Sequence, residues 1–582
     1  MLLSKTRSSG RATNGTRQMP PSLALYLGHF ANALGLLILA LLCPSKALAA
    51  NSLFTAGMGF SANSHIVSSS FFIWFDGSPQ IGPWQPLEGS STWNGDVNFF
   101  KSQIKQIMAA NIDVLLVYQR CDWDPSAYTF VPGPFAPALK NFFRALYELR
   151  RDGYDVPKIA PVLGLGGSKV LDVSTTRGKD AFVSAYILFY TAYFGENPDP
   201  AAGDFLARID NHVVLDVWHV SSAVENYTQL TRSDVSSRLS AALSGFSQVF
   251  NNSVYLIATA DKTETLSFAD EKISQFQHTL HSKLYTWNGI TTVQLKAGYW
   301  DQNLRHPGQF LLRDGGHYYV AAWQSVNRSV VKRAYVESWN EVTEGSGVYA
   351  ADPGPPFIMA GNTNRDTWSS INSSFEYIDT TAQYAAQFND RLQRGASFLL
   401  TDLPTSIRAG ETRTGTVIVR NEGDARWTGS AAYKLGQKSD SGVFFGSDRY
   451  LIDDAQDEIS FYKGIYRGRP KTFTVSLTAP STPGVYNLKW QMVQEGVQWF
   501  GDELTWQVTV RSADPGTVYV DAQNTGKQDG TLAFPYRTVA GGYNSSVAGD
   551  TVSIAAGSYP EHLRLTKWLR LESRNGTTRI GQ

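Results

Sequence analysis

The stretch DVNFFKSQIKQIMAANIDVLLVYQRCDWD, residues 96–124, decides how the first half of the chain is expected to fold. Apolar residues recur at helical spacing from Phe99 to Met108, and VLLVY (114–118) then forms a short apolar run. An amphipathic helix followed by a buried strand is the repeating unit of a parallel sheet, because parallel strands need a long crossover connection. The stretch therefore predicts an α/β unit.

The same alternation extends over residues 51–392, which we predict to be one domain. A second amphipathic stretch, PALKNFFRALYELRRDG (137–153), predicts another crossover helix. Eight strands separated by helices favour a (β/α)8 TIM barrel, whose usual length of ~250 residues can exceed 400. Eight apolar runs predict these strands: FFIWF (71–75), VLLVY (114–118), KIAPVL (158–163), VVLDVW (213–218), VYLIAT (254–259), TTVQLK (291–296), YYVAAW (318–323) and AYVESW (334–339).

An open doubly wound sheet is the alternative fold for this region. Such sheets that bind dinucleotides carry a glycine-rich fingerprint after an early strand, and GLGG (164–167) lacks its spacing. We therefore prefer the barrel.

The chain becomes rich in β-type alternation and turn residues after the predicted barrel. Residues 396–511 predict an all-β sandwich, because short strands alternate with Gly and Pro turns. Three segments of this region resemble the Ig-like domain of selective-autophagy cargo receptors, which also occurs in bacterial extracellular proteins: VRNEGDARW (419–427), TAPSTPGVYNLKWQMV (478–493) and WFGD (499–502). In this chain the resemblance implies an accessory or spacer role.

Residues 515–582 resemble the start of a right-handed parallel β-helix, with YVDAQNTGKQDGTLAFPYRTV (519–539) and GDTVSIAAGSYPE (549–561) as the matching pieces. A solenoid needs about three or more repeats to bury a continuous core. The tail is therefore expected to be an incomplete β-helix.

The N-terminus has the order of a secretory signal. Basic residues precede an apolar stretch from Leu23 to Leu42, and Ala47-Leu48-Ala49 fits a small-residue cleavage site. We expect residues 1–49 to be the signal peptide and the protein to be secreted or displayed at the cell surface. An uncleaved membrane anchor is the alternative, since the apolar stretch approaches the ~20 residues that span a bilayer.

Composition excludes several classes of partner and cofactor. Lysine plus arginine (51) equals aspartate plus glutamate (51), so the basic footprint of a nucleic-acid-binding protein is missing. The nine histidines and two cysteines show no spacing typical of metal ligands, such as HExxH or paired CxxC. We expect no metal, no cofactor and no nucleic acid, and no membrane contact after signal cleavage. We also expect a monomer.

Acidic and aromatic residues follow several of the predicted strands. Active sites of TIM barrels lie at the carboxyl ends of the strands, so these residues are candidate substrate contacts. Any single one could instead be a helix cap or a surface acid. The candidates for substrate binding are Asp76, Asp122, Trp123, Trp218, Tyr299, Trp300, Asp301, Trp339 and Asn340.

Glu341 and Glu344, in VESWNEVTEGSGVYAADPG (336–354), are the candidate catalytic pair. Residues three apart point to opposite faces of a strand but lie ~5–6 Å apart in a helical turn, so the pair requires a turn after Asn340. Such a separation suits the ~5–5.5 Å of retaining glycosidases better than the ~6.5–9.5 Å of inverting ones. The alternative is that Asn340 caps an ordinary helix with two acids in its first turn.

The segment SWNEVTEG (338–345) after AYVE resembles the WNEW-x-EGT signature of glycoside hydrolase family 99 and its barrel relatives. DVNFFKSQIKQIMAANIDVLLV (96–117) and AGYWDQNLR (297–305) with GGHYYVAAWQSV (315–326) add to this similarity, which covers about residues 51–390. The resemblance implies endo-α-mannosidase-like chemistry with retention. It implies that Glu341 is a general base on the sugar's 2-hydroxyl, giving an anhydro-sugar, and that Glu344 is the general acid and then base.

The chain departs from that signature in two places. Val342 replaces an aromatic residue, which is expected to alter the sugar platform, and SGVYAADP (346–353) replaces a shorter loop. Both departures put α-mannan specificity in doubt. The sequence thus predicts a secreted glycoside hydrolase acting on a polysaccharide or glycan. A non-catalytic carbohydrate-binding or cell-surface protein on the same barrel is the alternative, and an adhesin built from the β-modules is a third possibility.

Overall fold

The structure is a computed structural model that describes residues 59–581 with short gaps. The predicted signal peptide, residues 1–49, lies outside the described residues. Within the part of the chain that is described, no helix is both long and apolar enough to cross a bilayer. The gaps are residues 165–170, 199–201, 219–223, 251–252, 261–267, 275–279, 363–364, 440–442, 455–457, 460–461 and 513–515.

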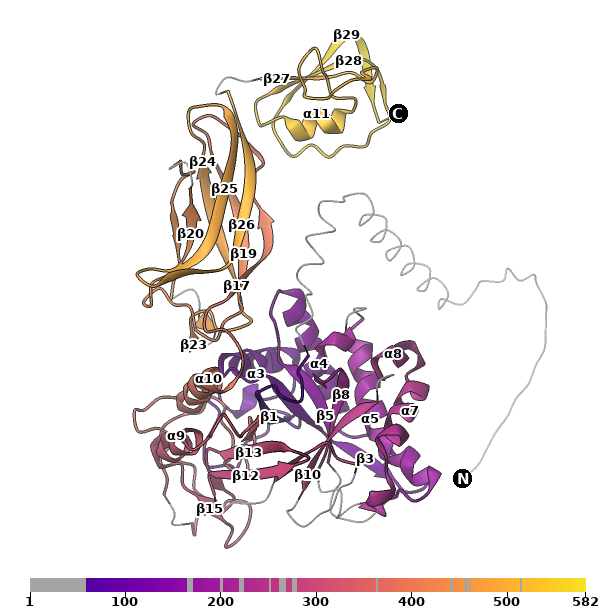
Figure 1. The fold of residues 1–582 in the computed structure, drawn as a ribbon, viewed down its shortest axis with the longest axis vertical. Coiled ribbons are helices and arrows are strands. Elements are labelled where there is room, and N and C mark those ends of the chain that lie inside the picture. The colour runs from indigo at the N-terminus through magenta and orange to yellow at the C-terminus, as the bar shows by residue number, and fades with distance from the viewer. Residues whose placement is uncertain are drawn as a thin grey trace, which may run out of the picture. The chain divides into compact units, whose positions relative to one another are not determined.

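A ten-stranded, nearly closed sheet organises the first half of the described chain (Figure 1). Its strands are β1 (Ile66–Phe72), β2 (Val114–Gln119), β5 (Lys158–Gly164), β7 (Arg208–Ile209), β8 (His212–Trp218), β10 (Val254–Ala260), β11 (Glu271–Ser274), β12 (Ser282–Trp287), β13 (Ile290–Lys296) and β16 (Arg333–Glu337). The order is β11-β10-β8-β5-β2-β1-β16-β13-β12, and β7 pairs with β8. Every pair of neighbouring strands on this path, from β11 at one end to β13, is parallel. The last strand, β12, is antiparallel to β13.

Helices and small hairpins connect these strands. The helices are α3 (Val97–Ala109), α4 (Ala136–Arg151), α5 (Thr176–Glu196), α7 (Arg232–Ala242), α8 (Ser247–Phe250), α9 (His317–Gln324) and α10 (Glu376–Phe388). The short paired strands are β3 (Cys121–Asp124) with β4 (Thr129–Pro132), β6 (Leu171–Asp172) with β9 (Val224–Glu225), and β14 (Tyr299–Trp300) with β15 (Phe310–Leu311).

The two predicted crossover helices form for the expected reasons. Asp96 caps α3 by accepting a hydrogen bond from the Phe99 N–H at 2.7 Å, which satisfies one of the helix's free amides. Helix α4 ends with Arg150 and Arg151, whose charges suit a helix C-terminus. Both helices bury the apolar face that the sequence pattern predicts, and Phe142 of α4 stacks on Phe71 of β1 with ring centroids 5.0 Å apart.

Two strand predictions need correction. Residues 318–323 form helix α9, because Tyr319, Ala322 and Trp323 are buried at helical spacing. Strand β11 takes the missing place in the sheet, and its four residues, EKIS, lack the apolar run that would have revealed it. The first strand also lies earlier than predicted, ending at Phe72.

The predicted α/β fold with a barrel-like sheet is confirmed in this coarse form. The exact (β/α)8 count stays a prediction, since within the described residues the backbone ladder ends at β11 and the antiparallel β12 adds a strand. A side-chain bond crosses the remaining gap, where the Thr292 hydroxyl of β13 donates to the Lys272 carbonyl of β11 at 3.0 Å.

Residues 396–511 contain two antiparallel-rich sheets over their own apolar core, which includes Trp427 and Trp490. One sheet has the order β17-β19-β24 and the other β18-β26-β25-β20-β21. The strands are β17 (Ala396–Asp402), β18 (Ser406–Arg408), β19 (Thr412–Asn421), β20 (Tyr433–Lys438), β21 (Arg449–Leu451), β24 (Pro470–Thr478), β25 (Gly484–Gln494) and β26 (Gln498–Arg511), with the small hairpin β22 (Glu458–Ile459) and β23 (Tyr462–Lys463) beside them in the chain.

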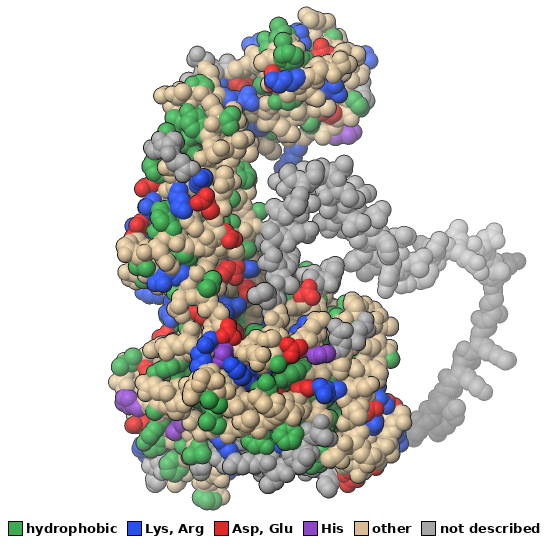
Figure 2. Space-filling view, in the orientation of Figure 1, with side chains coloured by type: hydrophobic (Ala, Val, Ile, Leu, Met, Phe, Trp, Pro, Cys, Tyr) green, Lys and Arg blue, Asp and Glu red, His purple; other side chains and the backbone are tan. Residues whose placement is uncertain are grey.

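The tail forms a three-stranded parallel sheet with one helix. Strands β27 (Thr517–Val520), β28 (Thr551–Tyr559) and β29 (Arg570–Ile580) pair in that order, and α11 (Val539–Ser545) packs on a small core. Parallel pairing of successive strands agrees with one turn of a β-helix, and the β-helix itself stays a prediction. Acidic and basic side chains are interspersed over the visible face of the molecule (Figure 2).

A buried ion pair joins β11 to β16 inside the barrel-like sheet. The Arg333 guanidinium lies 3.0 Å from the Glu271 carboxylate, and both side chains are almost fully buried. The Tyr255 hydroxyl donates to the same carboxylate at 3.0 Å, and Arg333 also donates to the Ser64 carbonyl at 2.6 Å. Each buried charge therefore depends on the other for its stability.

Replacing one member of this pair should destabilise the barrel-like domain. We expect Arg333→Met to lower the free energy of unfolding by about 3–5 kcal/mol, because Glu271 would keep a buried charge without its partner. Urea unfolding followed by tryptophan fluorescence measures this change. The double variant Arg333→Met/Glu271→Leu should recover most of the loss, and a double variant as unstable as the single one would contradict this account.

Candidate functional site

The segment that carries the two glutamates continues directly from β16. This strand is paired with β1 on one side and β13 on the other, and it ends at Glu337. Beyond it, the Trp339 N–H donates to the Ser70 carbonyl at 2.9 Å. The Asn340 side chain accepts from the Phe72 N–H and donates to the Phe72 carbonyl, both at 2.8 Å. The amide thus extends the contact with β1 past the end of the strand.

A tight turn follows Asn340, and no helix begins there. The Gly345 N–H donates to the Val342 carbonyl at 3.0 Å, and Gly345 has a left-handed φ of 57°. The N–H groups of Ser346 and Gly347 both donate to the Glu341 carbonyl at 3.2 Å. The next helix is α10, so the alternative that the acids open an ordinary helix is wrong. The turn brings Glu341 and Glu344 to one local region.

Arg313 stabilises this turn by binding its backbone carbonyl groups. Its Nη2 donates to the Gly345 carbonyl at 2.8 Å and to the Gly347 carbonyl at 2.7 Å. Its guanidinium is buried and lies 4.3 Å from the Trp368 ring centroid and 4.6 Å from that of Tyr377. A cation held between aromatic faces in a dry site is stabilised by their quadrupoles. Arg313 therefore fixes the backbone that follows Glu344.

Position 82 restricts the turn from the opposite side. Gly82 has no space for a Cβ atom, because the backbone carbonyl of Val342 occupies it. The Val342 side chain itself is buried, with 1% of its surface exposed. This side chain therefore points into the core.

Glu344 lies in a cationic environment. Arg305 Nη2 donates to Glu344 Oε1 at 2.7 Å, and Arg305 Nη1 donates to Asp301 Oδ2 at 2.6 Å. The Tyr299 hydroxyl donates to the same Asp301 oxygen at 3.0 Å. The Arg305 guanidinium thus makes a charge-assisted hydrogen bond to Glu344.

Glu341 lies in a different environment, although it is only three residues away. Its side chain is half-buried, and its Oε1 accepts a hydrogen bond from the Thr343 N–H at 3.2 Å. Burial raises the pKa of Glu341 to about 8, and the negative charge of Glu344 adds to this rise. At neutral pH the Glu341 carboxyl is therefore mostly protonated.

A third glutamate, Glu337, lies at the end of β16. Its carboxylate is 3.3 Å from the Lys296 ammonium and also contacts the Gln294 amide, both on β13. Burial raises the pKa of Glu337, whereas the Lys296 charge opposes this rise. Sequence reasoning did not select Glu337, Lys296 or Arg313, and its only signal was that Glu337 and Lys296 end neighbouring strands.

Five of the candidate substrate contacts are buried next to the turn. The Trp339 indole N–H donates to Gln103 of α3 at 2.8 Å, and the Asn340 side chain is bound to the backbone of β1. The Trp300 indole donates to Gln302 at 2.7 Å, and its backbone N–H donates to the Glu344 carbonyl at 2.8 Å. At most 5% of the surface of any of the five is exposed: Tyr299, Trp300, Asp301, Trp339 and Asn340. These residues hold the site in position in this conformation.

The other four candidates lie after different strands. Asp76 is exposed after β1, where Ser78 hydrogen bonds hold its pKa below the usual range, as in an ordinary turn. Asp122 is exposed on β3, and the half-buried Trp123 packs against neighbouring aromatic rings of the β3–β4 hairpin. Trp218 is half-buried at the end of β8. The structure thus groups Tyr299 and Asp301 with Glu344, and it places these four elsewhere on the strand ends.

A buried carboxyl, Asp216, lies inside the sheet on β8. The Thr259 hydroxyl of β10 lies 3.1 Å and 3.2 Å from its two oxygens. Burial raises the pKa of Asp216 to about 7, with the Thr259 hydrogen bond opposing the rise. Within the described residues no cluster of three metal-ligating side chains occurs.

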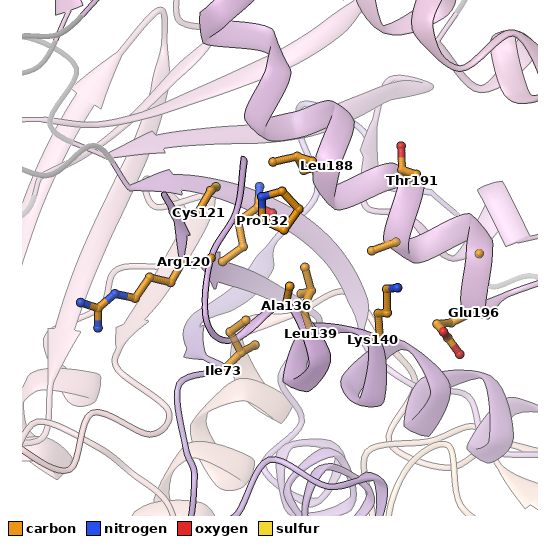
Figure 3. Close-up of a pocket in the computed structure, with 14 residues that line it drawn as sticks. Ile73, Arg120, Cys121, Pro132, Ala136, Leu139, Lys140, Leu188, Thr191 and Glu196 are labelled. Carbon is orange, nitrogen blue, oxygen red and sulfur yellow. The ribbon is translucent and has the colours of Figure 1, made fainter. Parts of the chain in front are cut away.

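A cavity of about 450 Å³ lies between α4 and α5 (Figure 3). Leu139 and Lys140 of α4 face Leu188 and Thr191 of α5 across it. Cys121 also lines this cavity, and burial raises the pKa of its thiol to about 12. The lining includes no residue of the segment 337–347, so the cavity is not the candidate catalytic site.

Comparison with known proteins gives one family match and several distant structural likenesses. Residues 403–510 match the family model of the Ig-like domain from next to BRCA1 gene, which supports the predicted Ig-like sandwich. No curated protein matches the chain.

The solved structures that it resembles include glycoside hydrolases. A GH99 endo-alpha-mannosidase from Bacteroides thetaiotaomicron is 14% identical with a TM-score of 0.39, over 56% of this chain and 98% of that one. The same enzyme in complex with BIS-TRIS-Propane gives 14% identity over the same shares, with a TM-score of 0.36. A glycoside hydrolase family 30 subfamily 8 xylanase from Clostridium acetobutylicum is 10% identical, over 72% of this chain and 98% of that one, with a TM-score of 0.25.

Loss of the Asn340 side chain should loosen the glutamate segment. We expect Asn340→Ala to lower the free energy of unfolding by about 1–3 kcal/mol, because two backbone groups of Phe72 would lose their partner. Urea unfolding measures the change, and Asn98→Ala on the exposed face of α3 is the matched control. Equal stability of the two variants would show that Asn340 does not anchor the segment.

The Cys121 thiol should react slowly with alkylating agents. A pKa of about 12 rather than 9.0 implies a roughly thousand-fold smaller thiolate fraction at pH 8. Iodoacetamide labelling at residue 121, followed by peptide mass spectrometry, should therefore be slow in the folded protein and fast after denaturation in guanidinium. Equal rates in both states would refute the perturbed pKa.

Proposed function

We propose that the protein is a glycoside hydrolase that acts on a polysaccharide or glycan with retention of configuration, using Glu341 and Glu344 as its catalytic pair. The single observation that supports this most is the unlike environment of the two carboxyls on one tight turn. One is half-buried with a raised pKa, and the other is bound to Arg305. Glycosidases need one carboxyl group as acid and one as carboxylate.

The short connection between the two glutamates supports retention. The negative charge of Glu344 contributes to the raised pKa of Glu341, so the two carboxyls are electrostatically coupled. Retaining glycosidases hold their carboxyls only ~5–5.5 Å apart, whereas inverting enzymes leave room for a water molecule between them. Two residues on one tight turn suit the smaller separation.

The surroundings of the pair also support hydrolysis of a large, exposed substrate. Glu344 and Arg305 are partly exposed, with 29% and 51% of their side-chain surfaces accessible, so a substrate can reach them. Secretion or cell-surface display follows as part of the proposal from the predicted signal at residues 1–49. Glycans outside the cell are then the natural substrate class.

Hydrolysis of a panel of α- and β-linked polysaccharides tests the proposal. We expect the wild-type chain to cleave at least one of them, and Glu341→Gln and Glu344→Gln each to lower kcat/KM by about 10²–10⁴-fold, since each removes a proton-transfer group. Glu148→Gln on α4 is the control and should keep full activity. Circular dichroism should confirm that all variants fold.

Other outcomes would overturn this function. Cleavage by both glutamine variants at the wild-type rate would exclude the pair from catalysis. Binding of glycans without any cleavage by the wild-type chain would favour a carbohydrate-binding protein on the same scaffold.

A further inference from the structure

We propose that Arg305 holds Glu344 as the ionised member of the pair, so that Glu341 carries the proton and acts as the general acid. This assignment rests on the proposed function and is the reverse of the roles that the family 99 resemblance implies. It adds Arg305 as a positioning residue, acting through Glu344.

Asp301 and Tyr299 hold the Arg305 guanidinium next to Glu344. Its Nη1 lies 2.6 Å from Asp301 Oδ2 and 3.2 Å from the Tyr299 hydroxyl, while its Nη2 lies 2.7 Å from Glu344 Oε1. Asp301 is nearly fully buried and is anchored in turn by the Gln309 N–H at 2.6 Å. The guanidinium therefore bridges two acids, and protonation of Glu344 would break a charge-assisted hydrogen bond.

Glu341 lacks such a cation. Within the described residues its carboxylate makes no ion pair, and its Oε1 hydrogen bond comes from the neutral backbone of Thr343. Arg305 lowers the pKa of Glu341 only as a minor influence, whereas burial and the charge of Glu344 raise it. A single proton held by the two carboxyls is therefore more stable on Glu341 than on Glu344.

The remaining charged groups around the pair do not reverse this order. Glu337 adds negative charge from β16, but it is paired with Lys296 of β13. The Arg313 charge is taken up by two backbone carbonyls and two aromatic faces. Tyr349 is buried, and its raised pKa keeps its hydroxyl neutral. The acids outnumber the nearby cations, which favours one bound proton near neutral pH.

The proton transfers follow from this assignment. Glu341 gives its proton to the glycosidic oxygen as the bond from that oxygen to the anomeric carbon breaks and the electron pair stays on the oxygen. On the anhydro-sugar route that the family 99 resemblance implies, Glu344 accepts the proton of a hydroxyl of the same sugar, and the oxygen of that hydroxyl bonds to the anomeric carbon. In the second step water attacks that carbon and gives a proton to Glu341, while Glu344 returns its proton to the departing sugar oxygen.

Carboxyl titration tests the charge assignment without any substrate. Glutamate labelled with ¹³C at the side-chain carboxyl is followed by NMR from pH 4 to pH 10, and Glu341→Gln and Glu344→Gln assign the two signals. We expect the step near pH 8 on the Glu341 signal. In Arg305→Gln the upper step should spread over both signals, since coupled groups share their titration.

Two arginine variants serve as controls for this titration. Arg305→Lys keeps the charge and should retain the wild-type order, and Arg144→Gln on α4 removes an arginine whose ion pair with Glu196 lies outside the site. The proposal is overturned if the step near pH 8 belongs to Glu344 in the wild-type protein, or if Arg305→Gln titrates like wild type.

Leaving-group dependence tests the catalytic roles. On the 2,4-dinitrophenyl glycoside of the sugar found in the panel, whose leaving group needs no proton, Glu341→Gln should stay within about tenfold of wild type while Glu344→Gln stays inactive. The wild-type kcat/KM on the natural glycan should fall as pH rises through about 8, since Glu341 then loses its proton. The opposite results would support the roles that the family 99 resemblance implies. These results are activity of Glu344→Gln, and not of Glu341→Gln, on the dinitrophenyl glycoside, or a wild-type kcat/KM that rises as the pH passes through about 8. If no sugar is cleaved, the proposed function fails, and the titration still decides the charge assignment.

Discussion

The pairing of β16 with β1 and β13 at the same time is the constraint on which the site depends. Two ladders of hydrogen bonds hold this strand, and the Asn340 amide continues the contact with β1 beyond its end. A segment anchored on both sides can begin its turn at only one place. The position of Glu337 therefore follows from the sheet, and the turn that carries Glu341 and Glu344 begins directly beyond it.

Chemically identical side chains acquire different properties along this segment. Glu337 faces Lys296, Glu344 faces Arg305, and Glu341 faces no cation within the described residues. The cations come from the β13 strand and the residues after it, so the neighbouring strand decides which charges face the segment. Electrostatic differences of this kind are what acid–base catalysis at constant pH requires.

Periodicity in the sequence was sufficient for much of the fold but not for the site. The helices around Phe99 and Phe142 and most of the parallel strands follow from apolar spacing. Strand β11 escaped because buried Glu271 and Lys272 interrupt the apolar pattern, and residues 318–323 were misread because a short aromatic run suits strand and helix alike. The inward direction of Trp339 and Asn340 depends on partners in α3 and β1, which the local sequence does not reveal.

The contact between Gly82 and the Val342 carbonyl links two positions that lie far apart in the sequence. Any side chain at position 82 would push against the peptide backbone between the two glutamates. Natural relatives that keep this turn should therefore keep glycine at 82, and a change there would have to be matched by a rearranged backbone near 342. Correlated substitution of these two positions would then report whether the turn is inherited, even where the surrounding sequence has diverged.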